Sequence, residues 1–120
     1  MLNKNVRTSN NITVINKAAF SSEKEIDFND YGVINSAMNS FKNTGIYLGE
    51  NVKKESIKVK TTTIDHFCKI NNIEPNFIKI DAENAEYEIL LGMNEVLKKH
   101  KPILSLEFGD FNIEHVPRGK

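Results

Sequence analysis

The clearest hydrophobic pattern lies in residues 75–108. Phe77-Ile-Lys-Ile is a short and nearly continuous apolar run, which is typical of a strand buried in a parallel sheet. In residues 84–101 the apolar side chains recur at three- and four-residue spacing, which predicts one amphipathic helix. Ile103-Leu-Ser-Leu then predicts a second buried strand.

This strand, helix and strand have the roughly 30 residues of a βαβ crossover, which makes its two strands parallel. Parallel strands end at the same edge of a sheet, so we expect Asp81, Glu83 and Glu107 to lie together there. Open α/β sheets bind their ligands at that edge, which makes the three carboxylates candidate functional residues. The alternative is structural: Glu83 and Glu86 serve the helix N-terminus, and Glu107 is a solvated strand end.

Shorter β-type patterns precede this unit. The β-branched run Ile12-Thr-Val-Ile predicts a first strand that ends at Asn16. Residues 25–28 and 56–61 alternate between polar and apolar side chains and predict an antiparallel ribbon. Residues 29–56 show no steady period and no cap signals, which indicates a functional loop or a disordered segment.

A short helix is predicted from about Thr63 to Asn71. Thr62 and Asp65 stand at capping-box spacing ahead of its apolar residues. Cys68 is the single cysteine of the chain, so neither an internal disulfide nor a cysteine-built zinc site can form. It falls among apolar residues and is predicted to be a small core residue. The three histidines stand far apart in the chain and are expected to be structural or solvated.

Charge and composition restrict the class of protein. The 16 basic and 16 acidic residues balance, so nothing points to nucleic acid or a membrane surface as a partner. No apolar run is long enough to span a membrane, and residues 1–11 lack the apolar core of a signal peptide. We therefore expect a cytoplasmic, soluble protein with one domain over residues 12–120, preceded by the polar segment 1–11.

Three segments occur in a characteristic order: Thr62-Thr-Ile-Asp, then Phe77-Ile-Lys-Ile-Asp-Ala-Glu-Asn-Ala-Glu-Tyr-Glu-Ile-Leu-Leu-Gly-Met, then Lys101-Pro-Ile-Leu-Ser-Leu-Glu. Together they closely resemble the conserved core of the FkbM family of S-adenosylmethionine-dependent methyltransferases. The resemblance covers most of residues 12–108. It implies an α/β fold, here a partial Rossmann-like methyltransferase sheet, mostly parallel, with a βαβ core at 75–108.

The same resemblance implies an activity and a set of site residues. The activity is methyl transfer from S-adenosylmethionine to an oxygen of a sugar or small metabolite. Asp81 and Glu83 would be catalytic, because they would face the point where the acceptor meets the methyl group. Asn16 and Ala18 would lie beside the adenine of the cofactor, and Glu107 would bind the substrate. No metal is expected, since no further ligand pattern accompanies the acids.

Two departures from the family pattern open an alternative. Asn84 stands where the family usually has glycine, and the glycine-rich first motif with its ribose-binding acid is missing. We therefore expect a truncated domain whose sheet lacks its first two strands. The alternative is a non-catalytic α/β interaction module that has lost the cofactor site and self-associates through an exposed sheet edge. In either case Lys79 is expected to be structural and paired with a neighbouring acid.

Overall fold

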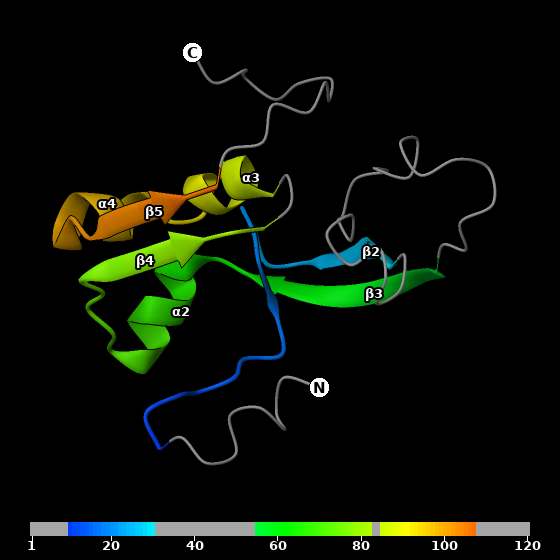
Figure 1. Cartoon of the computed structure of the whole chain (residues 1–120), viewed down its shortest axis with the longest axis horizontal. Helices are drawn as coiled ribbons and strands as arrows, with labels where there is room; N and C mark the ends of the chain where they lie inside the picture. Colours follow the sequence, from blue (N-terminus) through cyan, green and yellow to red (C-terminus); the bar gives the residue numbers. More distant parts are fainter. Residues whose placement is uncertain (1–9, 31–54, 83–84, 108–120) are drawn as a thin grey trace.

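The computed structural model describes residues 10–30, 55–82 and 85–107. This part of the chain contains two small β-sheets and three helices (Figure 1). One sheet has three strands in the order β1-β3-β2, and the other pairs β4 with β5. The described strands are β1 (Ala18–Ala19), β2 (Glu25–Asp30), β3 (Glu55–Thr62), β4 (Phe77–Ile80) and β5 (Ile103–Leu106). The described helices are α2 (Ile64–Asn71), α3 (Glu86–Leu91) and α4 (Asn94–His100).

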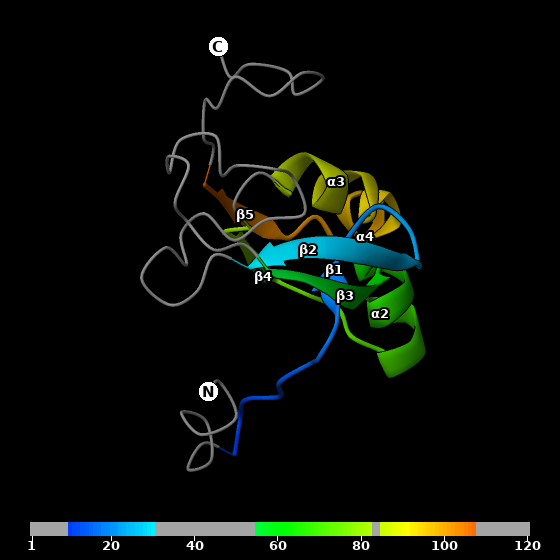
Figure 2. The ribbon, with the colours of Figure 1, turned by 90° about the vertical axis from the view of Figure 1, so that its right-hand side faces the viewer.

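The predicted parallel pairing is confirmed, but the predicted burial of both strands is wrong for one face, where Phe77 and Ile103 are exposed. Strands β4 and β5 are parallel, with Phe77 aligned to Ile103 and Ile80 to Leu106. Helices α2, α3 and α4 lie on one side of this pair (Figure 2). On that side Ile80 packs into the main core with one buried residue from each helix and with Met93, which is fully buried. The buried residues of this core are Cys68, Ile80, Ile89, Met93 and Val96.

The single helix predicted over residues 84–101 is wrong, because the chain breaks at Gly92 and forms α3 and α4 instead. A side chain at Gly92 could not fit, since a Cβ there would lie 2.2 Å from the Phe20 carbonyl oxygen. Beside this contact the Ser21 hydroxyl donates to the Glu88 carboxylate. The break therefore lets the chain near β1 pass close to the helices.

Asp65 stabilises the new helix start. Its two carboxylate oxygens accept from the backbone N–H groups of Glu95, at 3.0 Å, and Val96, at 2.8 Å. The first backbone N–H groups of a helix have no partner within it, and Asp65 supplies one from α2. The predicted capping box is thus wrong: Thr63 caps α2 by accepting from the His66 N–H, and Asp65 caps α4.

The predicted strand at residues 12–15 is also wrong. Ile12 and Ile15 are 50% and 44% exposed, and the strand lies further on, where β1 runs parallel to β3. Burial explains this position, because Phe20 is almost completely buried and its N–H donates to the Thr62 carbonyl. A β-branched run favours a strand only when a partner strand accepts it.

The predicted ribbon is confirmed and is longer than expected. Strands β2 and β3 are antiparallel, from Glu25 opposite Lys60 to Asp30 opposite Glu55. Most of the segment predicted to be a loop, residues 31–54, lies outside the described residues. No helix among the described residues is long and apolar enough to cross a membrane. The fold is mixed α/β, with one all-parallel pair of strands.

Candidate functional site

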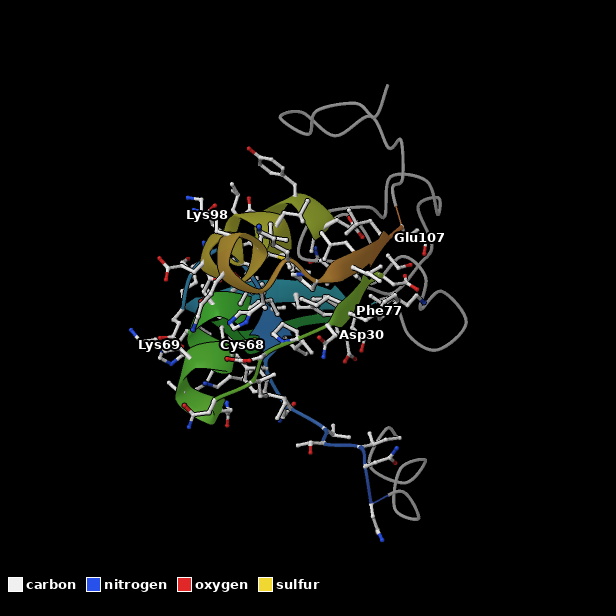
Figure 3. The ribbon with its side chains drawn as sticks, turned by 90° about the vertical axis from the view of Figure 1, so that its left-hand side faces the viewer. Asp30, Cys68, Lys69, Phe77, Lys98 and Glu107 are labelled. Carbon is white, nitrogen blue, oxygen red and sulfur yellow. The ribbon has the colours of Figure 1, made fainter. Side chains whose placement is uncertain are left out.

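The carboxyl ends of β4 and β5 bring two of the predicted acids together. The ladder between the strands continues one step beyond them, since the Glu107 N–H donates to the Ile80 carbonyl at 3.0 Å. Asp81 and Glu107 therefore follow their strands at neighbouring positions. Figure 3 shows Glu107 at the tip of β5, far from Lys98 on α4. The edge where open α/β sheets bind ligands is thus acidic and open to solvent.

Lys79 and Asp81 form an ion pair at this edge. The Lys79 Nζ lies 2.9 Å from the Asp81 Oδ2, which confirms the predicted pairing of Lys79 with a neighbouring acid. The hydrogen bond from Lys79, followed by the contact with Glu107, holds the pKa of the Asp81 carboxyl below its usual value. The same contact with Asp81 raises the pKa of Lys79. Asp81 therefore remains a carboxylate well into the acid range.

Glu83, the third predicted acid, lies outside the described residues. Its neighbour Glu86 is almost completely buried, and its carboxylate accepts from the Ala82 N–H at 2.9 Å. Glu86 thus shapes the connection from β4 to α3, as the structural alternative predicted for it. Sequence reasoning did not foresee this contact with Ala82, although the crowding of acids at the helix start pointed toward a local role.

The two residues predicted to lie beside the adenine are located at or just before a strand of the other sheet. Asn16 is exposed and precedes β1, while Ala18 is half-buried in β1 and aligned with Thr61. Strand β1 pairs with β3, whereas Asp81 follows β4. The described residues predicted for catalysis therefore follow β4, those predicted for adenine binding lie at β1, and these two strands do not pair with each other.

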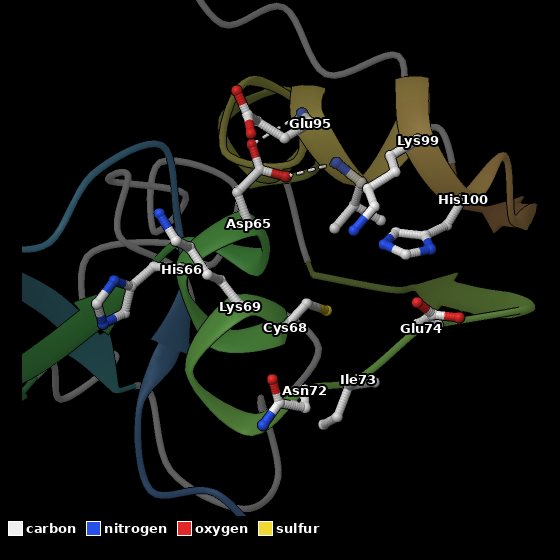
Figure 4. A pocket seen from close by; sticks show the side chains of 11 residues that line it. Asp65, His66, Cys68, Lys69, Asn72, Ile73, Glu74, Glu95, Lys99 and His100 are labelled. Atoms are coloured by element: carbon white, nitrogen blue, oxygen red, sulfur yellow. Dashed lines mark hydrogen bonds between the residues drawn. The ribbon is translucent and has the colours of Figure 1, made fainter.

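A hollow of about 610 Å³ lies between α2 and α4 (Figure 4). Acids and bases both line it, and the Cys68 side chain points into it between Glu74 and the helices. Burial, followed by the charge of Asp65, raises the pKa of the Cys68 thiol, which keeps it protonated and unreactive. Because Glu74 precedes β4, this hollow lies at the amino end of that strand. It is therefore at the opposite end of the sheet from Asp81.

The family model described as the methyltransferase FkbM domain matches residues 3–117. The chain belongs to the FkbM methyltransferase domain family. Neither the curated proteins nor the solved structures contain a significant match. Membership of the FkbM family confirms the resemblance of the three sequence segments. It indicates methyl transfer as the type of chemistry to consider at the acidic edge.

Two carboxyl side chains, those of Asp81 and Glu107, follow neighbouring strands at this edge. No group of three or more His, Cys, Asp or Glu residues in the described part of the chain could hold a metal ion.

Proposed function

We propose that this FkbM chain is an S-adenosylmethionine-dependent methyltransferase domain that methylates a hydroxyl oxygen of a sugar or small metabolite. The observation that supports this most is the contact of Asp81 with Glu107 at the carboxyl edge of a parallel pair of strands, in a chain of this family. The parallel pair would form part of a Rossmann-like methyltransferase sheet, and the helices would cover one face of it.

The cofactor, when bound, supplies an electrophilic methyl group on a sulfonium. Asp81 would accept a hydrogen bond from the acceptor hydroxyl and take its proton as the new oxygen–methyl bond forms and the sulfur–methyl bond breaks. Glu107 would contact the same acceptor, and Glu83 would share the catalytic role. The main contribution of these residues is to hold the oxygen in line with the methyl group.

Asn16 and Ala18 complete the proposal, as residues that would lie beside the adenine. The exposed position of Asn16 leaves its amide open to a ligand, and Ala18 presents only a methyl group beside one. Asn16 lies two residues before β1 and Ala18 begins it, and Ala19, the other residue of β1, packs against the same core as Ile80. The two sheets are therefore connected through this core, which supports a shared site.

The proposal is tested by calorimetric titration of S-adenosylhomocysteine, the demethylated product, into the full chain. We expect micromolar binding by the unchanged chain. Asp81 would also attract the ammonium group that this product keeps, so Asp81→Ala should weaken binding at least about tenfold, the loss expected for one charge-assisted contact. The matched control is Asp27→Ala, because Asp27 is also an exposed aspartate paired with a lysine. Absence of binding by a well-folded chain would contradict the proposal.

A second candidate, a non-catalytic interaction module, is favoured by a different observation. Phe77 and Ile103 are aligned across β4 and β5, and they are 58% and 70% exposed. Parallel sheets are normally covered on both faces, so this pair would favour a partner. Light scattering after size-exclusion chromatography tests it: a defined dimer that does not bind S-adenosylhomocysteine supports the interaction module, and a monomer that binds it supports the methyltransferase.

A further inference from the structure

The hollow between α2 and α4 is lined by charged side chains, and only some of them have a partner within the fold. The Asp65 carboxylate accepts from two backbone N–H groups at the start of α4. The His66 Nε2 lies 3.4 Å from the Glu23 Oε1. In the part of the chain that the structure describes, the side chains of Lys99 and Glu74 form no ion pair and no hydrogen bond. These two charges are therefore available to a ligand.

Lys99 and Glu74 approach the hollow from different sides. In Figure 4, Lys99 and His100 extend into it from α4, and Glu74 lies across from them on the segment before β4. The Glu95 carboxylate lies near Asp65, at the start of α4, rather than among these three side chains. One cation and one acid thus border the same space without pairing with each other.

The floor of the hollow is apolar. Cys68 and Val96 line it and are 7% and 3% exposed, as members of the main core. Ile73, which is 40% exposed, adds an aliphatic side chain to the wall. The volume of about 610 Å³ is within the range of about 300–1,000 Å³ that is usual for small-molecule sites. A ligand here would place an apolar group on the floor and charged groups toward the walls.

The walls of the hollow are fixed where the two helices end. Asn72 ends α2 and Lys101 ends α4, and they have φ values of 52° and 48°. They are the two residues other than glycine with a positive φ among the residues that the structure describes. This conformation is unfavourable for a lysine, and such positions are concentrated at functional sites. Since Asp65 also links α2 to α4, a ligand would enter a site that is already formed.

We propose that this hollow is a second ligand site of the chain, for a small zwitterion such as a free α-amino acid with an apolar side chain. Lys99 binds the carboxylate of the ligand, with the His100 imidazole beside it. Glu74 binds the ammonium group from the opposite wall. The apolar side chain of the ligand packs on Cys68 and Val96, the buried residues of the floor.

A zwitterion fits the hollow better than a simple ion does. An anion would pair with Lys99 but would be repelled by Glu74, and a cation would be attracted and repelled in the opposite way. An α-amino acid carries both charges and its side chain on one carbon atom, so a single molecule can contact both walls and the floor. The hollow lies at the amino end of β4, away from Asp81, so this site does not depend on the methyltransferase function proposed above.

NMR titration of the nitrogen-15-labelled full chain tests the site with L-leucine as the probe. Isocaproate, which lacks the ammonium group, and isoamylamine, which lacks the carboxylate, are the matched controls. We expect L-leucine to shift the amide signals of α2 and α4 around the hollow, with saturation at about millimolar concentration. Each control compound should bind at least about threefold more weakly, the effect of one partly exposed charge contact. Isocaproate or isoamylamine binding as tightly as L-leucine would overturn the proposal, as would the absence of shifts around the hollow.

Two pairs of variants test the assigned residues. Lys99→Met and Glu74→Gln should each weaken L-leucine binding at least about threefold. The control for the first is Lys98→Met, because Lys98 is also an exposed lysine of α4 but does not line the hollow. The control for the second is Glu25→Gln, at an exposed glutamate of the ribbon. A control that weakens binding as much as its partner variant would overturn the proposal, and circular dichroism shows whether each variant is folded.

S-adenosylhomocysteine also contains an α-amino acid group, so its titration is repeated in Lys99→Met. Unchanged binding of S-adenosylhomocysteine, together with weakened binding of L-leucine, supports two separate sites. Equal weakening of both ligands supports the hollow as an amino-acid site and contradicts the cofactor position proposed beside Asp81. Unchanged binding of both ligands in Lys99→Met overturns the site in the hollow and leaves the methyltransferase proposal standing.

Discussion

Two exposed lysine–aspartate pairs, one on each sheet, look alike and differ in their surroundings. On the antiparallel ribbon, Lys58 lies 2.8 Å from Asp27, its directly opposite neighbour, and both side chains are 63% exposed. At the end of the parallel pair, Lys79 lies 2.9 Å from Asp81, and these side chains are 64% and 41% exposed. By distance alone the two pairs are equivalent.

The difference is a second acid in contact with the aspartate itself, because on the ribbon the nearby Glu25 acts on Lys58 only. Strands β4 and β5 are parallel and end together, so Glu107 reaches Asp81, and its hydrogen bond lowers the pKa of that carboxyl further. On the ribbon, the strands run in opposite directions and Asp27 lies within a strand. A surface ion pair contributes little by itself. An aspartate whose pKa is lowered by two neighbours at a strand end is a candidate functional residue.

The two regions also differ in what lies beneath them, and this gives the largest expected effect. Met93 is fully buried under the parallel pair, so Met93→Ala should lower the free energy of unfolding by about 2–5 kcal/mol. Ile57 on the ribbon is 45% exposed, and Ile57→Ala should cost only about 1 kcal/mol. Urea unfolding of both variants measures the difference. Equal losses would show that the ribbon carries as much of the core as the parallel unit.

A smaller effect is expected where α2 caps α4. Asp65→Ala leaves the N–H groups of Glu95 and Val96 without their acceptor and should lower the free energy of unfolding by about 1 kcal/mol. Asp65→Asn keeps one acceptor oxygen and should lose less. The control is Asp27→Ala on the ribbon, where no helix start depends on the carboxylate. Urea unfolding is again the measurement, and a loss in the control as large as in Asp65→Ala would argue against capping.

The smallest effect concerns pH. The pKa of Asp81 is lower in the folded chain than its ordinary value of 3.8, so the folded chain binds fewer protons there and stability falls as pH falls. The contribution of Asp81 is present above pH 3.8 and is lost as pH drops through the folded pKa. The pKa of Lys79 is raised from 10.5, so its contribution is present below that pH and is lost as pH rises through the folded pKa.

We therefore expect Asp81→Asn to be slightly less stable than the unchanged chain at neutral pH and equal to it in strong acid. The urea midpoints of the two proteins, compared across the acid range, measure this convergence. A difference in urea midpoint that persists in strong acid would show that the substitution acts through packing rather than through the charge of Asp81. In Lys79→Met the Asp81 pKa loses its main lowering contact, so Asp81→Asn in that background should show a weaker pH dependence.

Much of the fold follows from local patterns. The apolar runs predicted as strands form β4 and β5 in parallel register, and Thr63 caps α2 within one residue of the expected position. The alternating segments of β2 and β3 pair as expected. In these cases hydrophobic periodicity and helix capping act between residues close in the chain, so the sequence contains the information directly.

Of the candidate site, the sequence predicted the meeting of Asp81 and Glu107 and the pairing of Lys79 with an acid. It could not say which acid pairs with Lys79, because that contact depends on side-chain positions at the end of β4. The role of Asp65 was also out of reach, since its partners Glu95 and Val96 lie 30 and 31 residues away.

The sequence by itself determined the order of the elements, the parallel strand–helix–strand unit and the family. Only the tertiary structure decided where the long apolar helix breaks. At Gly92 the Phe20 carbonyl lies so close that no side chain would fit, and Phe20 is distant in the sequence. The tertiary structure also decided that β1 begins at Ala18 rather than Ile12, since the edge of β3 accepts the chain where Phe20 is buried. The physical reason is common to both: periodicity is set within a segment, whereas a helix break or a strand register depends on contacts with a segment distant in the chain.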